Sequence, residues 1–105
     1  MTKAVFHRSL SHFASFTVSG HAGYRESGED IVCAGISSAV MLTANGLTEV
    51  AKLPCDIAVE EDGEISLSVQ KEDDLADLFI ESLYIHLLTL QEEYPEFLKV
   101  VTVEV

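Results

Sequence analysis

A histidine and a cysteine lie twelve residues apart in this chain, joined by a loop that several glycines interrupt. The segment runs from Gly20-His21 through Asp30 to Cys33. A cysteine thiolate is a strong nucleophile, and a neighbouring imidazole can take the thiol proton and later return it to a leaving group. The pair therefore indicates cysteine nucleophile chemistry, with Cys33 as nucleophile and His21 as base.

The surrounding pattern predicts where these side chains lie. Alternating residues before Gly20 predict a strand that ends there, and the apolar residues after Asp30 predict a helix with Asp30 as its N-cap. Cys33 then falls in the first helical turn, where unpaired N–H groups favour a thiolate. Asp30 has a second interpretation, as the carboxylate that orients His21, although capping is favoured. The alternative for Cys33 is a small buried side chain without chemistry.

Other residues of the same segment have two interpretations each. Ser37 lies one turn after Cys33 and could donate a hydrogen bond near the thiolate, or it is a small residue that allows close packing. Gly20, Gly23 and Gly28 predict a loop that closes over a substrate, or a plain flexible connection. A phosphate-binding loop is not indicated, because the G-x-x-x-x-G-K-[ST] pattern is absent.

The remaining cysteine and histidines are interpreted as structural. Cys55 alternates with apolar residues on one face of a predicted strand, so we expect it in the core. His86 falls on the apolar stripe of a predicted helix and is expected in the core or an interface, whereas His7 and His12 flank a turn and are expected to be exposed. Neither C-x-x-C nor H-E-x-x-H occurs, so we predict no metal site and no cofactor.

Hydrophobic periodicity predicts seven elements in the order β-β-α-β-β-α-β. This order indicates an α+β fold, a mixed β-sheet with two packed helices. On the second strand, Ala14, Phe16 and Val18 are expected to share the buried face, and Leu75 and Leu78 are expected on the buried stripe of the second helix. The strands are predicted at 3–9, 13–19, 55–60, 65–70 and 99–105, and the helices at 30–45 and 73–93.

Size and charge limit the classes of function. A chain of 105 residues fits one domain, residues 1–105. Six Lys and Arg against eighteen Asp and Glu give a net charge of −12, which argues against direct nucleic acid binding and is compatible with a basic protein partner, or with solubility alone. With no signal-peptide pattern, no apolar run expected to cross a membrane and too few cysteines for a disulfide framework, we expect a cytoplasmic protein.

The motif Gly20-His21-Ala22, followed by Gly28-Glu29-Asp30-Ile31-Val32-Cys33-Ala34 and Ser37, closely resembles the ribosomal-processing cysteine protease family, Prp. The resemblance extends over nearly the whole chain. It implies a homodimeric cysteine-protease-like domain that removes the N-terminal extension of a large-subunit ribosomal protein during ribosome assembly, cutting after a Phe. It also implies a Cys33–His21 dyad, with Asp30 and Ser37 matching the motif. The alternative is a non-catalytic acidic assembly factor that binds a basic ribosomal protein.

Overall fold

The structure, a computed structural model, describes residues 1–20 and 27–105, and for residues 27–30 it describes the course of the backbone only. The order of its elements confirms the predicted α+β fold. The strands are β1 (Thr2–Ser9), β2 (His12–Ser19), β3 (Cys55–Val59), β4 (Ile65–Val69) and β5 (Leu98–Glu104), and the helices are α1 (Ser27–Asn45), the π-helical turn η1 (Gly46–Val50) and α2 (Asp74–Glu93).

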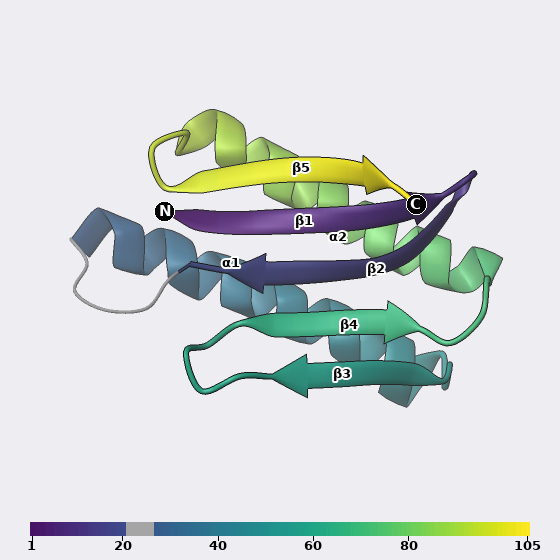
Figure 1. Ribbon diagram of the computed structural model, residues 1–105. Coiled ribbons are helices and arrows are strands. Elements are labelled where there is room, and N and C mark those ends of the chain that lie inside the picture. The colour runs from purple at the N-terminus through teal and green to yellow at the C-terminus, as the bar shows by residue number, and fades with distance from the viewer. Residues whose placement is uncertain (21–26) are drawn as a thin grey trace.

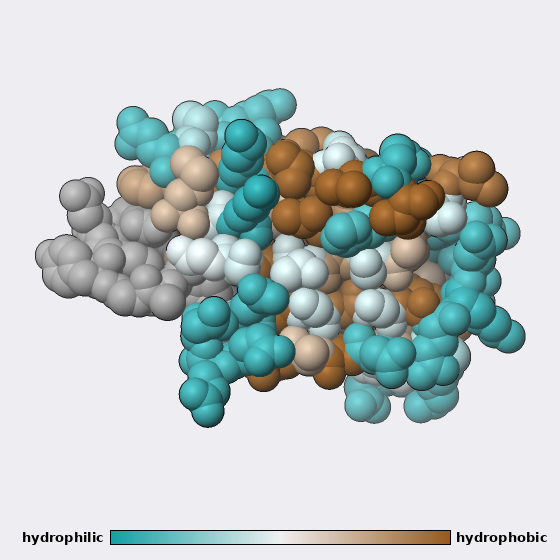
Figure 2. All heavy atoms as spheres, viewed as in Figure 1, coloured by the Kyte–Doolittle hydropathy of each residue, from teal (hydrophilic) through white to brown (hydrophobic). Residues whose placement is uncertain are grey.

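The five strands form one sheet in the order β3-β4-β2-β1-β5. Three neighbouring pairs are antiparallel, whereas β5 lies parallel to β1, so the sheet is mixed as predicted. Both helices lie on one face of this sheet (Figure 1). The opposite face, which Figure 2 shows, carries mainly weakly polar side chains over its middle and a hydrophobic patch at one margin.

The core lies between the helices and the sheet. Alternate residues of β1, such as Ala4 and Phe6, point into it, as the two-residue period of a strand requires. From α1, Val32, Ile36 and Val40 recur at helical spacing and pack onto the same core. The contribution of α2 is Ala76, Ile80, Leu83 and Leu87. Because α1 is fixed on the sheet by this stripe, the neighbouring residues on its sheet-facing side are fixed as well.

Helix α1 begins three residues before the predicted start. Asp30 therefore lies inside the helix, and its assignment as the N-cap is wrong. Cys33 becomes the seventh residue of α1 rather than the third. The favourable field of a helix start falls off within the first turn, so it no longer explains a stabilised thiolate at this position. Asp73 of α2 does act as an N-cap, because its carboxylate accepts from Leu75 N at 2.8 Å.

Helix α1 ends at Asn45, the last residue of the predicted helix 30–45, and Gly46 follows it. The chain continues into η1, and Gly46 does not have a positive φ. A Cβ at Gly46 would instead lie 2.5 Å from Cε1 of Phe79 on α2. The missing side chain therefore allows the two helices to pack closely.

Two predicted faces are corrected by the structure. The register between β1 and β2 shifts after His7, which pairs with Ser15, because Arg8 pairs with Phe13. This bulge places Phe13, rather than Ala14, on the buried face with Phe16 and Val18. On α2, Leu75 and Leu78 are 45% and 63% exposed, so the buried stripe runs through its neighbours instead.

One apolar helical segment has the length of a membrane span. Residues Ile31–Val50 form a helical segment that is long and apolar enough to cross a membrane by length and composition. The prediction that the chain contains no apolar run of this length is therefore wrong. The segment packs against the sheet through α1. The core helix of a globular protein can have the same length and composition, so these two properties are weak evidence for a membrane span.

Candidate active site around Cys33

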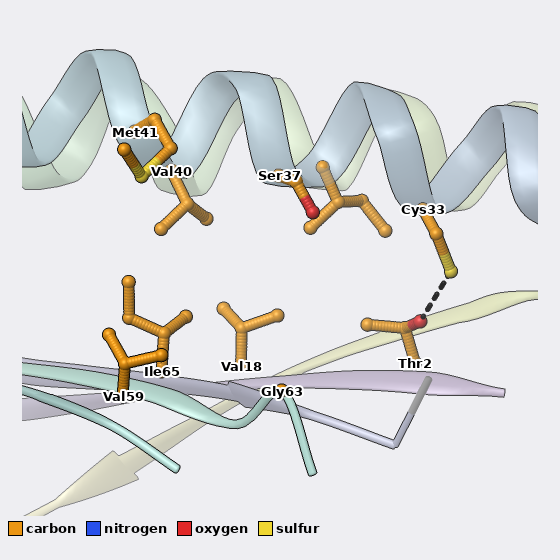
Figure 3. Close-up of a pocket in the computed structure, with 10 residues that line it drawn as sticks. Thr2, Val18, Cys33, Ser37, Val40, Met41, Val59, Gly63 and Ile65 are labelled. Carbon is orange, nitrogen blue, oxygen red and sulfur yellow. Dashed lines mark hydrogen bonds between the residues drawn. The ribbon is translucent and has the colours of Figure 1, made fainter. Parts of the chain in front are cut away.

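Helix α1 points Cys33 towards the sheet. Its neighbour Val32 and the following Ile36 are core residues, and the Cys33 side chain is only 6% exposed. The Sγ atom lies 3.4 Å from Oγ1 of Thr2, at the first residue of β1, which is a hydrogen bond in which either atom can donate (Figure 3). The thiol is thus enclosed between α1 and the start of β1.

A cavity of about 150 Å³ lies beside the Cys33 sulfur. In Figure 3, Cys33 and Ser37 project from α1 towards the strands, and Val18 and Ile65 project from the sheet towards the helix. Aliphatic side chains dominate the lining, which among the described residues includes no Asp, Glu, Lys or Arg. The lining residues are Thr2, Val18, Cys33, Ile36, Ser37, Val40, Met41, Val59, Gly63 and Ile65. The thiol therefore opens onto a space suited to one apolar group.

Gly20 follows the last residue of β2 and packs against the first residues of the chain. Its φ is +97°, a conformation that side-chain-bearing residues rarely adopt. A Cβ at this position would also lie 2.5 Å from the carbonyl oxygen of Met1 and 3.6 Å from Cα of Thr2. A glycine is therefore required by both conformation and space, next to the residue that contacts Cys33.

The other predicted site residues are placed only in part. Gly28 and Asp30 lie in the first residues of α1, where the backbone alone is described. His21 and Gly23 lie outside the described residues, so their approach to Cys33 stays a prediction. Ser37 is exposed on the cavity wall, one turn after Cys33, as its spacing predicts.

Cys55 differs from Cys33 in its surroundings. It is half-buried on β3 and packs against the core, in agreement with its structural interpretation. Burial raises the pKa of its thiol, and the charge of Asp56 adds to this effect. Both effects disfavour the thiolate, and Cys55 does not line the cavity. Both cysteines are free.

Two histidines differ from the predicted burial. His86 is exposed and therefore not a core residue; it lines the groove between α1 and α2, so its place in an interface stays a prediction. His12 is half-buried, and its Nδ1 lies 2.6 Å from Oδ2 of Asp77, while its Nε2 lies 3.5 Å from Glu72. The hydrogen bond with Asp77 raises the pKa of His12; burial opposes this, and the charges of Asp77, Glu72 and Asp74 reinforce it.

This cluster joins the β1–β2 hairpin to α2. The second oxygen of Asp77 accepts from Phe13 N at 2.9 Å. Among the residues that the structure describes, His12, Asp74 and Asp77 are also close enough to offer three metal ligands. Both carboxylate oxygens of Asp77 already form hydrogen bonds within the protein, so we interpret the cluster as a structural contact between the hairpin and α2. Sequence reasoning missed it because the partners are 64 and 65 residues apart.

The sequence model of the family described as "Cysteine protease Prp" matches residues 1–99 of this chain. The chain belongs to the cysteine protease Prp family. It is 32% identical to the ribosomal processing cysteine protease Prp of Bacillus subtilis over 109 aligned positions, which cover 97% of each chain. It is 34% identical to the Staphylococcus aureus protein of the same name over 79 positions, which cover 73% of this chain and 74% of that one.

Solved structures agree with this membership in the Prp family. A Streptococcus mutans protein superposes with a TM-score of 0.91 at 27% identity, covering 100% of this chain and 96% of that one. The ribosomal processing protease Prp of S. aureus, solved with a covalently linked product peptide, superposes with a TM-score of 0.86 at 26% identity, covering 98% of this chain and 100% of that one. The Prp family is thus a family of cysteine proteases with this fold.

Proposed function

We propose that this chain is a cysteine endopeptidase that removes the N-terminal extension of a large-subunit ribosomal protein during ribosome assembly. The observation that carries the proposal is the position of the Cys33 sulfur, which opens onto an apolar cavity. Membership in the Prp family and the names of the B. subtilis and S. aureus relatives support the substrate class. Residues 1–105 would act as one cysteine-protease-like domain.

The proposed mechanism uses a Cys33–His21 dyad. His21 takes the thiol proton of Cys33, and the thiolate sulfur attacks the carbonyl carbon of the scissile peptide bond. The tetrahedral intermediate collapses as the C–N bond breaks and His21 returns the proton to the leaving amine. Water then hydrolyses the thioester to release the carboxylate product and the free thiol. Asp30 and Ser37 are supporting residues in this proposal.

The cavity beside Cys33 would hold the side chain next to the cleaved bond. Its volume of about 150 Å³ is sufficient for a single side chain, and its walls are dominated by Ile36, Val40 and Ile65. Burial of an apolar group there would be favourable, at roughly 25 cal/mol per Å² removed from water. This fits the resemblance to enzymes that cut after a Phe. The segment with Gly20, Gly23 and Gly28 would close over the bound peptide.

The acidic surface supports a basic protein as substrate. A net charge of −12 attracts a cationic precursor and repels a nucleic acid backbone, so we propose no direct nucleic acid partner. We also propose no membrane partner and a cytoplasmic location. The same charge would oppose self-association except at an uncharged surface. The groove between α1 and α2 is lined by Ser38, Leu42, Ser82, His86 and their neighbours. Among the described residues its lining includes no Asp, Glu, Lys or Arg, which supports a homodimer.

The decisive experiment compares two cysteine variants on the precursor that carries its N-terminal extension. We expect Cys33→Ala to reduce the cleavage rate at least about 10³-fold, because the nucleophile is lost. Cys55→Ala is the matched control and should retain the wild-type rate, because Cys55 lies away from the cavity. A Cys33→Ala protein that trims the precursor at the wild-type rate would refute the proposal and favour a non-catalytic assembly factor.

A further inference from the structure

Thr2 is a buried polar residue beside the proposed nucleophile. Its side chain is completely inaccessible, and Oγ1 lies 3.4 Å from Sγ of Cys33 (Figure 3). Most other groups that line the cavity are aliphatic. A thiolate placed there would lose much of its hydration, which is costly unless a hydrogen-bond donor replaces the lost water.

The sheet fixes the backbone of Thr2, which carries the hydroxyl. Thr2 N donates to the carbonyl oxygen of Phe97 at 2.9 Å, and Thr2 pairs with Leu98 in the parallel ladder between β1 and β5. Close packing of Gly20 on Met1 and Thr2 restricts the same segment from the other side. The backbone that carries the hydroxyl is therefore held in place.

The start of α1 makes this hydroxyl more important. Cys33 is the seventh residue of the helix, so its own N–H lies in the interior of the helix, where such groups bond to the preceding turn. The unpaired N–H groups belong to the first four helical residues, 27–30. Among the described residues, Thr2 provides a side-chain hydrogen bond to the Cys33 sulfur.

We propose that Thr2 is a positioning residue for Cys33: its hydroxyl donates to the sulfur, holds it at the mouth of the cavity and stabilises the thiolate. With the neutral thiol, either atom can donate. Once the thiol has lost its proton, only the hydroxyl can donate, and a hydrogen bond to a charged acceptor is roughly twice as strong as a neutral one. The contact therefore favours the reactive form. This inference rests on the proposed role of Cys33 as nucleophile.

The test measures the rate of alkylation of Cys33 by iodoacetamide as a function of pH, in a Cys55→Ala background so that one thiol is observed. Thr2→Val removes the hydroxyl and keeps the branched shape, whereas Thr2→Ser keeps the hydroxyl. We expect Thr2→Val to move the midpoint of the rate profile upward by about one pH unit and to lower kcat for cleavage roughly tenfold with little change in KM. Thr2→Ser should stay close to the parent protein in both measurements.

Thr2→Ala gives a second test if Thr2→Val fails to fold, and it should shift the profile in the same direction. An unchanged profile in a folded variant that lacks the hydroxyl would overturn the inference. Equal shifts in Thr2→Val and Thr2→Ser would overturn it as well, because packing and not hydrogen bonding would then be responsible. Failure of the proposed function is read separately, since alkylation reports on the thiol whether or not Cys33 performs the cleavage.

Discussion

The two ends of β1 are held by different kinds of contact. At the Thr2 end, an uncharged hydroxyl meets the Cys33 sulfur beside an apolar cavity. At the other end, beyond Ser9, the turn leads to His12, which forms an ion pair with Asp77 and approaches Glu72. A carboxylate next to a thiol opposes thiolate formation, whereas a carboxylate next to a histidine stabilises the protonated imidazole and their ion pair. Among the residues whose side chains the structure describes, the acidic groups of the surface do not line the cavity beside the thiol.

This comparison predicts that changes at one end of β1 leave the other end unaffected. Stability and the alkylation rate of Cys33 are the two measurements that separate them. A substitution near Thr2 should change both quantities. A substitution of His12 or Asp77 should change stability alone.

The largest loss of stability is expected from Gly20→Ala. The positive φ and the 2.5 Å approach to the Met1 carbonyl oxygen combine backbone strain with a steric clash. We expect the free energy of unfolding to fall by about 2–4 kcal/mol. Urea denaturation measures this loss, and the alkylation rate of Cys33 should change too, because Thr2 is displaced with Met1.

Gly35→Ala is the matched control for Gly20→Ala. Gly35 lies in α1, and a Cβ there would meet no atom within 4 Å. Alanine in a helix interior is favoured over glycine by about 0.5–1 kcal/mol, so this variant should be slightly more stable than the wild type. A loss in Gly20→Ala no larger than the effect of Gly35→Ala would contradict the account of the Thr2 end.

A smaller loss is expected from Asp77→Ala at the other end. The substitution removes the acceptor of Phe13 N and the partner of His12 together. Leaving a partly buried donor without a partner costs about 1–3 kcal/mol, which urea denaturation can measure. Asp74→Ala is the control and should have little effect, because Asp74 is exposed. A change in the alkylation rate of Cys33 in folded Asp77→Ala would show that the two ends are not separable.

The smallest effect is the pH dependence that His12 contributes. The hydrogen bond to Asp77 raises the pKa of His12 above its ordinary value of 6.5. A raised folded-state pKa gives a stabilisation that is fully present below the unfolded-state value and is lost as the pH rises through the folded-state value. The urea midpoint of the wild type should therefore exceed that of His12→Gln by more at about pH 6 than at about pH 9. A difference that does not vary with pH would argue against a charged His12 in the folded protein.

Local patterns predicted the elements well and the long-range contacts poorly. The β3–β4 hairpin and α2 were visible as alternation and helical periodicity, and Asp73 was recognisable near the start of α2. The N-cap at Asp30 was wrong because a suitable capping residue can also occupy a helix interior, and nothing local excluded an earlier start. The bulge that exchanges Ala14 for Phe13 depends on pairing with β1, which periodicity within β2 does not contain.

The sequence by itself determined the α+β order of elements and the acidic character, whereas its choice of Cys33 over Cys55 as the reactive thiol stays a prediction. These follow from residue type and spacing along one segment at a time. Only the tertiary structure decided that Thr2 meets Cys33 and that Asp77 holds the β1–β2 hairpin, because each contact joins residues at least 31 positions apart. Such contacts are set by sheet register and helix packing. They cannot be predicted from the residues that neighbour each side chain in the sequence.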